Sequence, residues 1–326
     1  MDRSEWLIER KKGIGASEAA AVLGISPWSS PVGVWAEKKG LAPPIEDNFR
    51  LKLGRLLEEP VAQLYAEREG VTLTGGGYDL RWHPGGLPVF ATPDRHIEEF
   101  PRGLECKTVD PHMEGQWGED GTGDIPVYYV PQLVLGMAVT GYPEWHLAAL
   151  FGFGELRVYR LMRDMELEEA ILSRLTEFWN RYVIGNEEPP LDGSDACASY
   201  LAMKYPANRL PLIGAGAVEE KLLVDLFAIR EQVKADDAIQ TEYENRLKAI
   251  IGEAEGIQGV CGRVTWKKAK DSEKIDLDAA LKKLMAEMLV SFPEHANAIL
   301  AAEQSAKAQS IVIKPGSRRF LPTPAR

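Results

Sequence analysis

The chain has 326 residues, of which 45% are hydrophobic, and a formal net charge of −11. This length is enough for one large domain with a buried core and a smaller appendage. Because contacts with phosphate need lysine and arginine, the acidic balance argues against a general nucleic-acid binder, although not against a nuclease with a local basic channel. No uncharged apolar stretch reaches about 18 residues, so we expect no membrane helix.

Three widely separated cysteines, Cys106, Cys197 and Cys261, fit neither a disulfide framework nor a zinc site. The N-terminal segment MDRSEWLIERKKG is charged and lacks the apolar centre of a secretory signal. We therefore expect a cytoplasmic protein.

The first quarter of the chain is predicted to be helical. Residues 4–24 predict a helix, a glycine-containing turn and a second helix, with Ser17 as its N-cap. Residues 30–39 predict a short helix, and residues 51–68 a longer amphipathic one. Pro60 lies inside the longer helix, where we expect a kink or a restart.

From Val71 the pattern changes to short apolar runs divided by glycine and proline, which predicts an antiparallel meander. The runs are VTL, YDLRW, LPVFAT, RHIEE and LECKT. A helix then begins near Tyr129, because Pro131 fits only a first turn. Two more strands and a helix over residues 164–182 complete an α/β fold, in which a central mixed sheet is flanked by helices.

The composition changes again near residue 190. We expect a core over residues 1–190, a linker over residues 191–217 and a mainly helical C-terminal unit over residues 218–326. In that unit, a row of positions with strict 4–3 spacing over residues 222–254 predicts a coiled-coil-like helix, with Asp236 and Gln240 at the centre of the row. Such a helix indicates an intramolecular hairpin or an oligomer interface.

A small α/β region is expected after this helix. A strand over residues 259–270, a helix capped by Asp276, a helix over residues 294–307 and a strand over residues 310–314 are predicted. Its basic residues indicate either a nucleic-acid patch or a solvated strand face; they are Lys267, Lys268, Lys270, Arg318 and Arg319.

Residues 88–110, PVFATPDRHIEEFPRGLECKTVD, carry the pattern P-D-x(10)-E-x-K. Alternate side chains of a strand share a face, so Glu105 and Lys107 should point one way while Leu104 and Cys106 point into the core. If the preceding strand turns at Asp94, two carboxylates and an ammonium converge. A charged hairpin face without function would look the same.

Convergent carboxylates of this kind suit Mg²⁺, which favours oxygen ligands. The chemistry would be phosphodiester hydrolysis, in which Asp94 and Glu105 bind one or two Mg²⁺ and the metal activates a water. Lys107 would orient that water and stabilise developing charge. The helix that follows carries Gln132 toward the same region.

Five sequence blocks appear in a fixed order along the chain. They are R-x(6)-S in ERKKGIGASEAAAVLG followed by the P-W of GISPWSSP, G-x(4)-E-P in GRLLEEP, T-P-D in ATPDR, E-C-K, and Y-x-x-Q in YYVPQLVLGMAVTG. Over roughly residues 5–190 the chain thus resembles the YqaJ-type viral recombinases, the group of the PD-(D/E)xK nuclease superfamily that includes lambda exonuclease. The resemblance implies a restriction-endonuclease-like core.

The resemblance assigns roles around the carboxylates. It implies metal binding by Asp94, Glu105 and the main-chain carbonyl of Cys106, with Lys107 as the catalytic lysine. It selects Glu59, the residue before Pro60, over Glu58 as the helix carboxylate for a second metal or the water. It also makes Tyr129 and Gln132 supporting residues near the lysine.

The resemblance further implies a pocket for a 5′-phosphate. Arg10, Ser17 and Thr92 match three of its positions, and the first two could also hold an anion at a helix N-terminus. A further arginine that the family carries shortly after the lysine is missing, and Met113 stands there beside His112.

The implied activity is Mg²⁺-dependent 5′-to-3′ degradation of linear double-stranded DNA, with Mn²⁺ as an alternative ion. The 3′ overhang would serve a single-strand annealing protein in phage or prophage recombination. The implied assembly is a ring of identical chains, for example a trimer, around the duplex. The residues expected to line its channel are Arg81, Arg95, Arg102 and Lys107.

Two other functions are compatible with the sequence. One is a PD-(D/E)xK endonuclease or single-strand-specific nuclease, and the other is a non-catalytic DNA-binding scaffold that works through its coiled coil. Trp28 and Trp35 could stack on bases, but we expect both to pack in the core.

Overall fold

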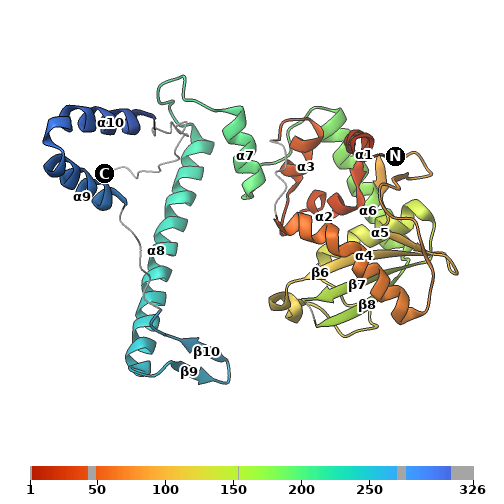
Figure 1. The fold of residues 1–326 in the computed structure, drawn as a ribbon. Helices are drawn as coiled ribbons and strands as arrows, with labels where there is room; N and C mark the ends of the chain where they lie inside the picture. Colours follow the sequence, from red (N-terminus) through yellow and green to blue (C-terminus); the bar gives the residue numbers. More distant parts are fainter. Residues whose placement is uncertain (1, 43–48, 153, 270–276, 310–326) are drawn as a thin grey trace. The chain divides into compact units, whose positions relative to one another are not determined.

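The computed structural model describes residues 2–42, 49–152, 154–269 and 277–309. The chain divides into two compact units, Met1–Pro206 and Ala207–Arg326 (Figure 1). Within the described ranges, none of the helices combines the length and apolar character that crossing a lipid bilayer would require.

A five-stranded mixed sheet forms the centre of the first unit. Its order is β2-β5-β6-β7-β8, with bounds Leu73–Thr74, Arg95–Ile97, Arg102–Val109, Glu144–Phe151 and Glu155–Met162. β6 runs parallel to β7, and the other neighbours are antiparallel. The predicted fold, a mixed sheet flanked by helices, is confirmed.

The predicted meander is wrong, because its strands belong to two sheets. β3 (Arg81–Trp82) and β4 (Val89–Ala91) pair with each other, and β4 also pairs in parallel with β1 (Ile14–Gly15). Between β4 and β5 the chain bends at Asp94 into the five-stranded sheet. Short apolar runs predict strands but not their partners, which are chosen by long-range packing.

Helices cover both faces of the five-stranded sheet (Figure 1). On one face, α4 (Phe49–Glu69) packs Val61 and Tyr65 against Leu104 and Cys106 of β6. The other face holds the larger core, which includes residues of α2 (Ala19–Val22), α5 (Val130–Thr140) and α6 (Met165–Phe178).

α4 continues through Pro60, so the helix does not end and restart there. The apolar stripe predicted for this helix is also only partly buried. Leu53, Leu56 and Leu64 are exposed, whereas Val61 and Tyr65 are buried.

α5 approaches the sheet closely because two glycines lie against one tryptophan. A Cβ on Gly136 of α5 would lie 2.6 Å from the ring of Trp145, and a Cβ on Gly103 of β6 would lie 2.5 Å from it. Both contacts are shorter than a real Cβ contact, so side chains at these positions would push α5 and β6 away from the ring. This packing sets the height of α5 above β6.

Near the N-terminus, α1 (Arg3–Glu9) is followed by short 3₁₀ turns at Arg10–Lys12 and Ala16–Glu18. Ser17 lies inside the second turn and is exposed, so the predicted N-cap is wrong. Gly15 is the N-cap of this turn, and the carboxylate of Glu18, at the third position, accepts a hydrogen bond from the Gly15 amide at 2.8 Å. In α3 (Pro31–Lys38), Ser30 caps the first turn by accepting from the Gly33 amide at 3.2 Å.

The predicted linker over residues 191–217 contains a helix, α7 (Asp195–Lys204). Its Tyr200 is buried with its ring edge-on to Trp35, at 5.1 Å between centroids. α7 therefore belongs to the first unit, which ends at Pro206. A π-helical turn, Trp179–Ile184, extends α6 as far as the predicted helix.

The second unit begins with a 35-residue helix, α8 (Ala217–Ile251). It ends before Gly252, a few residues earlier than predicted, because Gly252 adopts a φ of 52° that leaves the helical region. A hairpin of β9 (Gly256–Gly259) and β10 (Gly262–Thr265) follows, and then α9 (Leu277–Ser291) and α10 (Ala296–Gln309).

Part of the predicted basic patch can be placed. Lys267, which follows β10, pairs at 2.6 Å with Glu255, which precedes β9. Other predicted features lie outside the described residues: the Asp276 cap, the strand over residues 310–314, and Lys270, Arg318 and Arg319.

Candidate active site

The site is built on the alternation of β6. Leu104 and Cys106 face α4 in the core, and Glu105 lies on the opposite face with 5% of its surface exposed. Lys107 lies on the same side as Glu105 and donates to its Oε1 at 2.5 Å. The opposite orientation of these two pairs of side chains is as the sequence predicts.

Asp94 joins this strand from the bend between β4 and β5. Its Oδ2 accepts a hydrogen bond from the Cys106 amide at 2.8 Å. The bond fixes one carboxylate oxygen beside β6, between the side chains that flank Cys106. Asp94 and Glu105 therefore lie next to each other although ten residues separate them in the chain.

α5 contributes the two residues predicted to support the lysine. Gln132 Nε2 donates to Glu105 Oε1 at 2.5 Å, the same oxygen that accepts from Lys107. The ring centroid of Tyr129 lies 5.7 Å from Lys107 Nζ, a cation–π contact. Because the height of α5 depends on Gly136, the position of Gln132 depends on it too.

The neighbouring charges shift the pKa values of both Asp94 and Lys107. Burial raises the pKa of Asp94 well above its usual value, and the carboxylates of Glu105 and Glu58 raise it further. Burial alone would lower the pKa of Lys107, but Glu105 and Asp94 outweigh it and the pKa is raised. Lys107 is therefore an ammonium at all physiological pH values, and Asp94 retains negative charge only at a cost.

Three carboxylates line one cavity of about 240 Å³, those of Glu58, Asp94 and Glu105. Lys107 and Cys106 line it as well. Among the residues that the structure describes, no three acidic, histidine or cysteine side chains converge closely enough to hold an ion as they stand. The donor set nevertheless fits a divalent cation chemically, because three carboxylates line one cavity and carboxylate oxygens are what Mg²⁺ prefers.

The structure separates two adjacent glutamates of α4. Glu58 lines the cavity with Asp94 and Glu105. Glu59 is 60% exposed at its side chain and lines a different cavity of about 400 Å³. It accepts from Gln63 Nε2 at 3.0 Å and pairs with Arg95, and these bonds lower its pKa. Glu59, which the family resemblance selects, thus lies outside the cavity of Asp94 and Glu105, whereas Glu58 lines that cavity.

A sequence signal for Glu58 does exist. Glu58 precedes Val61, Ala62 and Tyr65 by three, four and seven residues, so it continues the buried stripe of α4 by one turn. Arg55, which the sequence analysis did not select, lies one further turn back and lines the same cavity. Both residues reach the site because that stripe faces β6.

Arg95 holds Glu58 in place. Its Nη1 donates to Glu58 Oε1 at 3.0 Å and also to the main-chain carbonyl of Asp94, while Nη2 pairs with Glu59. A Cβ at Gly76 would lie 2.5 Å from this guanidinium, so the glycine leaves room for it. The planar guanidinium presents several donors in a fixed fork, so one side chain can bridge two carboxylates and a carbonyl.

The residues expected to line a DNA channel are all engaged within the chain. Arg81 pairs with Asp79 at 2.7 Å, and Arg102 pairs with Glu144. Arg95 and Lys107 bind the carboxylates described above. None of the four has a guanidinium or ammonium that is free of a carboxylate, so the structure offers no support for this set as a channel lining.

The predicted phosphate pocket is only partly assembled. Arg10 lies 4.5 Å above the ring of Trp6, whose Nε1 donates to Thr92 Oγ1 at 3.1 Å. Trp6 thus connects Arg10 with Thr92, and among the described residues no hydrogen bond joins either of them to Ser17.

The cationic side chains of Arg10 and Lys38 already pair with one carboxylate. Glu18 is buried and binds Arg10 at 2.7 Å and Lys38 at 2.6 Å. Its burial would raise its pKa, but these two cations lower the pKa instead. Two cations share one carboxylate, so a single positive charge remains.

The two tryptophans considered for stacking differ. Trp35 is buried, with its Nε1 donating to the Tyr182 carbonyl at 3.0 Å, as predicted. Trp28 is 66% exposed, so its predicted core position is wrong. It packs on Tyr128 at 4.8 Å and on Tyr129 at 5.9 Å between centroids. Tyr129 therefore links it to Lys107.

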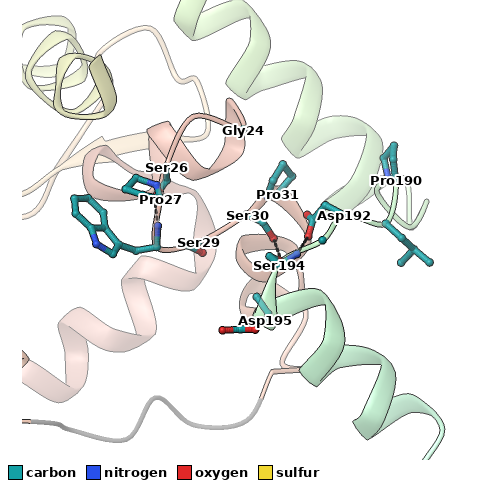
Figure 2. Close-up of a pocket in the computed structure, with 14 residues that line it drawn as sticks. Gly24, Ser26, Pro27, Ser29, Ser30, Pro31, Pro190, Asp192, Ser194 and Asp195 are labelled. Atoms are coloured by element: carbon teal, nitrogen blue, oxygen red, sulfur yellow. Dashed lines mark hydrogen bonds between the residues drawn. The ribbon is translucent and has the colours of Figure 1, made fainter. Parts of the chain in front are cut away.

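Trp28 also lines a pocket of about 660 Å³ between residues 24–31 and 190–196. Figure 2 shows Ser30, Asp192 and Ser194 side by side in it, and Ser194 Oγ donates to Ser30 Oγ at 2.9 Å. The pocket shares no lining residue with the cavity of the carboxylates. Its size alone does not make it the reactive site.

Residues 5–143 match the sequence model of the YqaJ-like viral recombinase domain. The uncharacterized protein YqaJ of Bacillus subtilis (strain 168) is 33% identical over 285 residues, covering 83% of this chain and 88% of its own.

Two solved structures are less similar. An alkaline exonuclease from Laribacter hongkongensis is 20% identical with a TM-score of 0.46, covering 56% of this chain and 93% of its own. A phage-related exonuclease from Haemophilus somnus 129PT is 11% identical with a TM-score of 0.39, covering 54% of this chain and 96% of its own.

Proposed function

Because this chain belongs to the YqaJ-like viral recombinase family, we propose that it is a DNA-hydrolysing enzyme that degrades linear double-stranded DNA from the 5′ end and leaves a 3′ overhang. The observation that carries the proposal is the meeting of Glu58, Asp94, Glu105 and Lys107 around one cavity. The family was predicted from five sequence blocks, and that prediction is confirmed.

We propose Mg²⁺ as the ion, with Mn²⁺ as a substitute. Asp94, Glu105 and the main-chain carbonyl of Cys106 would hold it, and Glu58 would serve in place of Glu59. Such an ion supplies a Lewis acid that lowers the pKa of a bound water and neutralises charge on the phosphate.

The chain's own residues would hold the reactive groups in position. The Cys106 amide fixes one oxygen of Asp94, and Gln132 fixes one oxygen of Glu105. The Lys107 ammonium, held protonated by Glu105 and Asp94, would stabilise the charge that develops on the phosphate in the transition state. The ring of Tyr129 lies beside this ammonium.

The direction of degradation would depend on the group around Trp6. Arg10 and Lys38 retain one positive charge after pairing with Glu18, and Trp6 connects Arg10 to Thr92. We propose that this group binds a terminal 5′-phosphate, with Ser17 nearby on the same 3₁₀ turn as Glu18. A ring of identical chains and a single-strand annealing partner stay predictions.

End-labelled linear duplex separates these proposals. With Mg²⁺ the protein should release labelled nucleotides from the 5′ end, and EDTA should stop the release. A closed circular duplex should remain intact. Absence of metal-dependent release from linear DNA would overturn the activity, and cleavage of the circle would favour an endonuclease.

The phosphate pocket needs its own measurement. A duplex with a 5′-phosphate end should be degraded faster than one with a 5′-hydroxyl end, and Arg10→Gln should reduce this difference. Lys12→Gln is the matched control, because Lys12 lies two residues away, is exposed and pairs with Glu9. Equal rates on both ends for the wild-type protein would contradict the proposed phosphate pocket but not the proposed hydrolytic site.

A further inference from the structure

α8 has an apolar row that nothing in the described chain covers. Every residue from 228 to 246 is exposed. Within this stretch Ile229 is 63% exposed, Val233 52% and Tyr243 59%. An apolar row on a long helix, here interrupted by Asp236 and Gln240, is typical of an interface, because leaving apolar side chains in water is costly.

The row follows the heptad spacing of a coiled coil. The a positions are Leu226, Val233, Gln240 and Leu247, and the d positions are Leu222, Ile229, Asp236, Tyr243 and Ile250. Leu226 and Leu247, near the two ends, are half-buried, and the centre is bare. Two such rows bury each other when a- and d-type side chains interlock.

The two polar residues of the row, Asp236 and Gln240, lie two residues before and two residues after Ala238, so an antiparallel second copy centred there places each opposite the other. We propose that α8 pairs with α8 of a second copy of the chain as an antiparallel coiled coil centred at Ala238. In this arrangement each a position faces a d position of the other copy. The pairs are Leu226 with Ile250, Val233 with Tyr243, Gln240 with Asp236, and Leu247 with Ile229.

The two polar residues of the row select the antiparallel direction. Asp236 accepts from Gln232 at 2.8 Å, and Gln240 donates to Glu244 at 2.9 Å, all within one helix. In the antiparallel pair the amide of Gln240 faces the carboxylate of Asp236 twice, and each pair can form a hydrogen bond. A parallel pair in register would place Asp236 against Asp236, two like charges losing water together.

The flanks of the row agree with this direction in part. At the e positions, Arg230 faces Glu244 of the second copy at both ends, and Ile239 faces its own equivalent on the other flank. Asp237 also faces its equivalent, which is a like-charge contact at the exposed rim. Such a contact in water costs little.

Cysteine pairing in the full chain tests the direction. The background is Cys261→Ser, because Cys261 is exposed while Cys106 and Cys197 are buried. On it we compare Val233→Cys, Tyr243→Cys and the double variant. Positions 233 and 243 are about 15 Å apart along one helix, too far for a disulfide within a chain.

The antiparallel pair predicts a specific pattern. Each single variant should stay uncrosslinked under mild oxidation, because its two cysteines would be about 15 Å apart along the coil. The double variant, and a mixture of the two single variants, should form a covalent dimer. The matched control is Lys234→Cys with Glu242→Cys, which lies at the same level on the outer face and should not crosslink.

Three results would overturn the proposal. Rapid crosslinking of either single variant would indicate a parallel pair. Crosslinking of the control as fast as the double variant would indicate random collision. A double variant that keeps its helix content by circular dichroism but forms no dimer would show that α8 does not pair with itself.

Discussion

The two units of this protein differ in how completely their side chains are partnered. In the first unit β6 is covered on both faces, and the charges around it meet counter-charges, such as Lys107 with Glu105 and Arg95 with Glu58. In the second unit the middle of α8 is exposed on every side. The candidate site is thus assembled within one chain, whereas we propose that α8 pairs with a second copy.

The largest expected effect is at the lysine of the site. Lys107→Ala should reduce nucleotide release from linear duplex by roughly a thousandfold or more, because a positioned charge in a buried site acts mainly on the transition state. The fold should survive, since the lysine lies at the cavity and not in the core. Lys12→Ala, which removes an exposed ammonium, should leave the rate unchanged; comparable loss in both would contradict the site.

The adjacent glutamates of α4 sharpen the comparison within the first unit. Glu58→Gln should lower the rate by about a hundredfold, because it removes one charge from the cavity. Glu59→Gln should lower it by no more than about threefold, because that carboxylate is exposed and acts only through Arg95. Rates measured at saturating Mg²⁺ decide between the two residues. A larger loss in Glu59→Gln than in Glu58→Gln would assign the catalytic role to Glu59.

A charge introduced into the apolar row of α8 should weaken self-association. Val233→Asp should weaken self-association of the full chain by about tenfold or more, because it buries a charge without a partner. Sedimentation at several protein concentrations measures the effect. Lys234→Asp, on the outer face of the same helix, is the control, and a similar change in both would argue against the row as an interface.

The smallest expected effect is a gain in stability at the site. Since burial and neighbouring carboxylates raise the pKa of Asp94, its ionised form disfavours folding when no metal is bound. Wild-type stability should therefore fall as pH rises from the unfolded pKa through the folded one. Asp94→Asn should lack this fall and melt a few degrees higher at neutral pH in EDTA, while losing activity. A lower melting temperature in thermal unfolding would contradict the repulsion.

Several features of the site could be predicted from the sequence because they follow from local periodicity. A strand turns alternate side chains to opposite faces, so the E-C-K block alone placed Glu105 and Lys107 on one side and Cys106 on the other. The heptad row of α8 follows in the same way from helical spacing. The family followed from five ordered blocks.

Other features depended on packing between distant segments. Neighbouring residues on a helix differ by about 100° in direction, so the choice between Glu58 and Glu59 depended on how Val61 and Tyr65 of α4 turn toward β6. Exposed leucines on the same helix concealed that stripe in the sequence.

The sequence by itself determined which residues share a face of β6 and which repeat along α8, because both depend on a local period. Only the tertiary structure decided the rest. It divided the expected meander between two sheets, left Trp28 exposed, and paired the expected channel cations with carboxylates. The physical reason is that strand partners, exposure and ion pairs are contacts between segments far apart in the chain, and no local pattern encodes which segments meet.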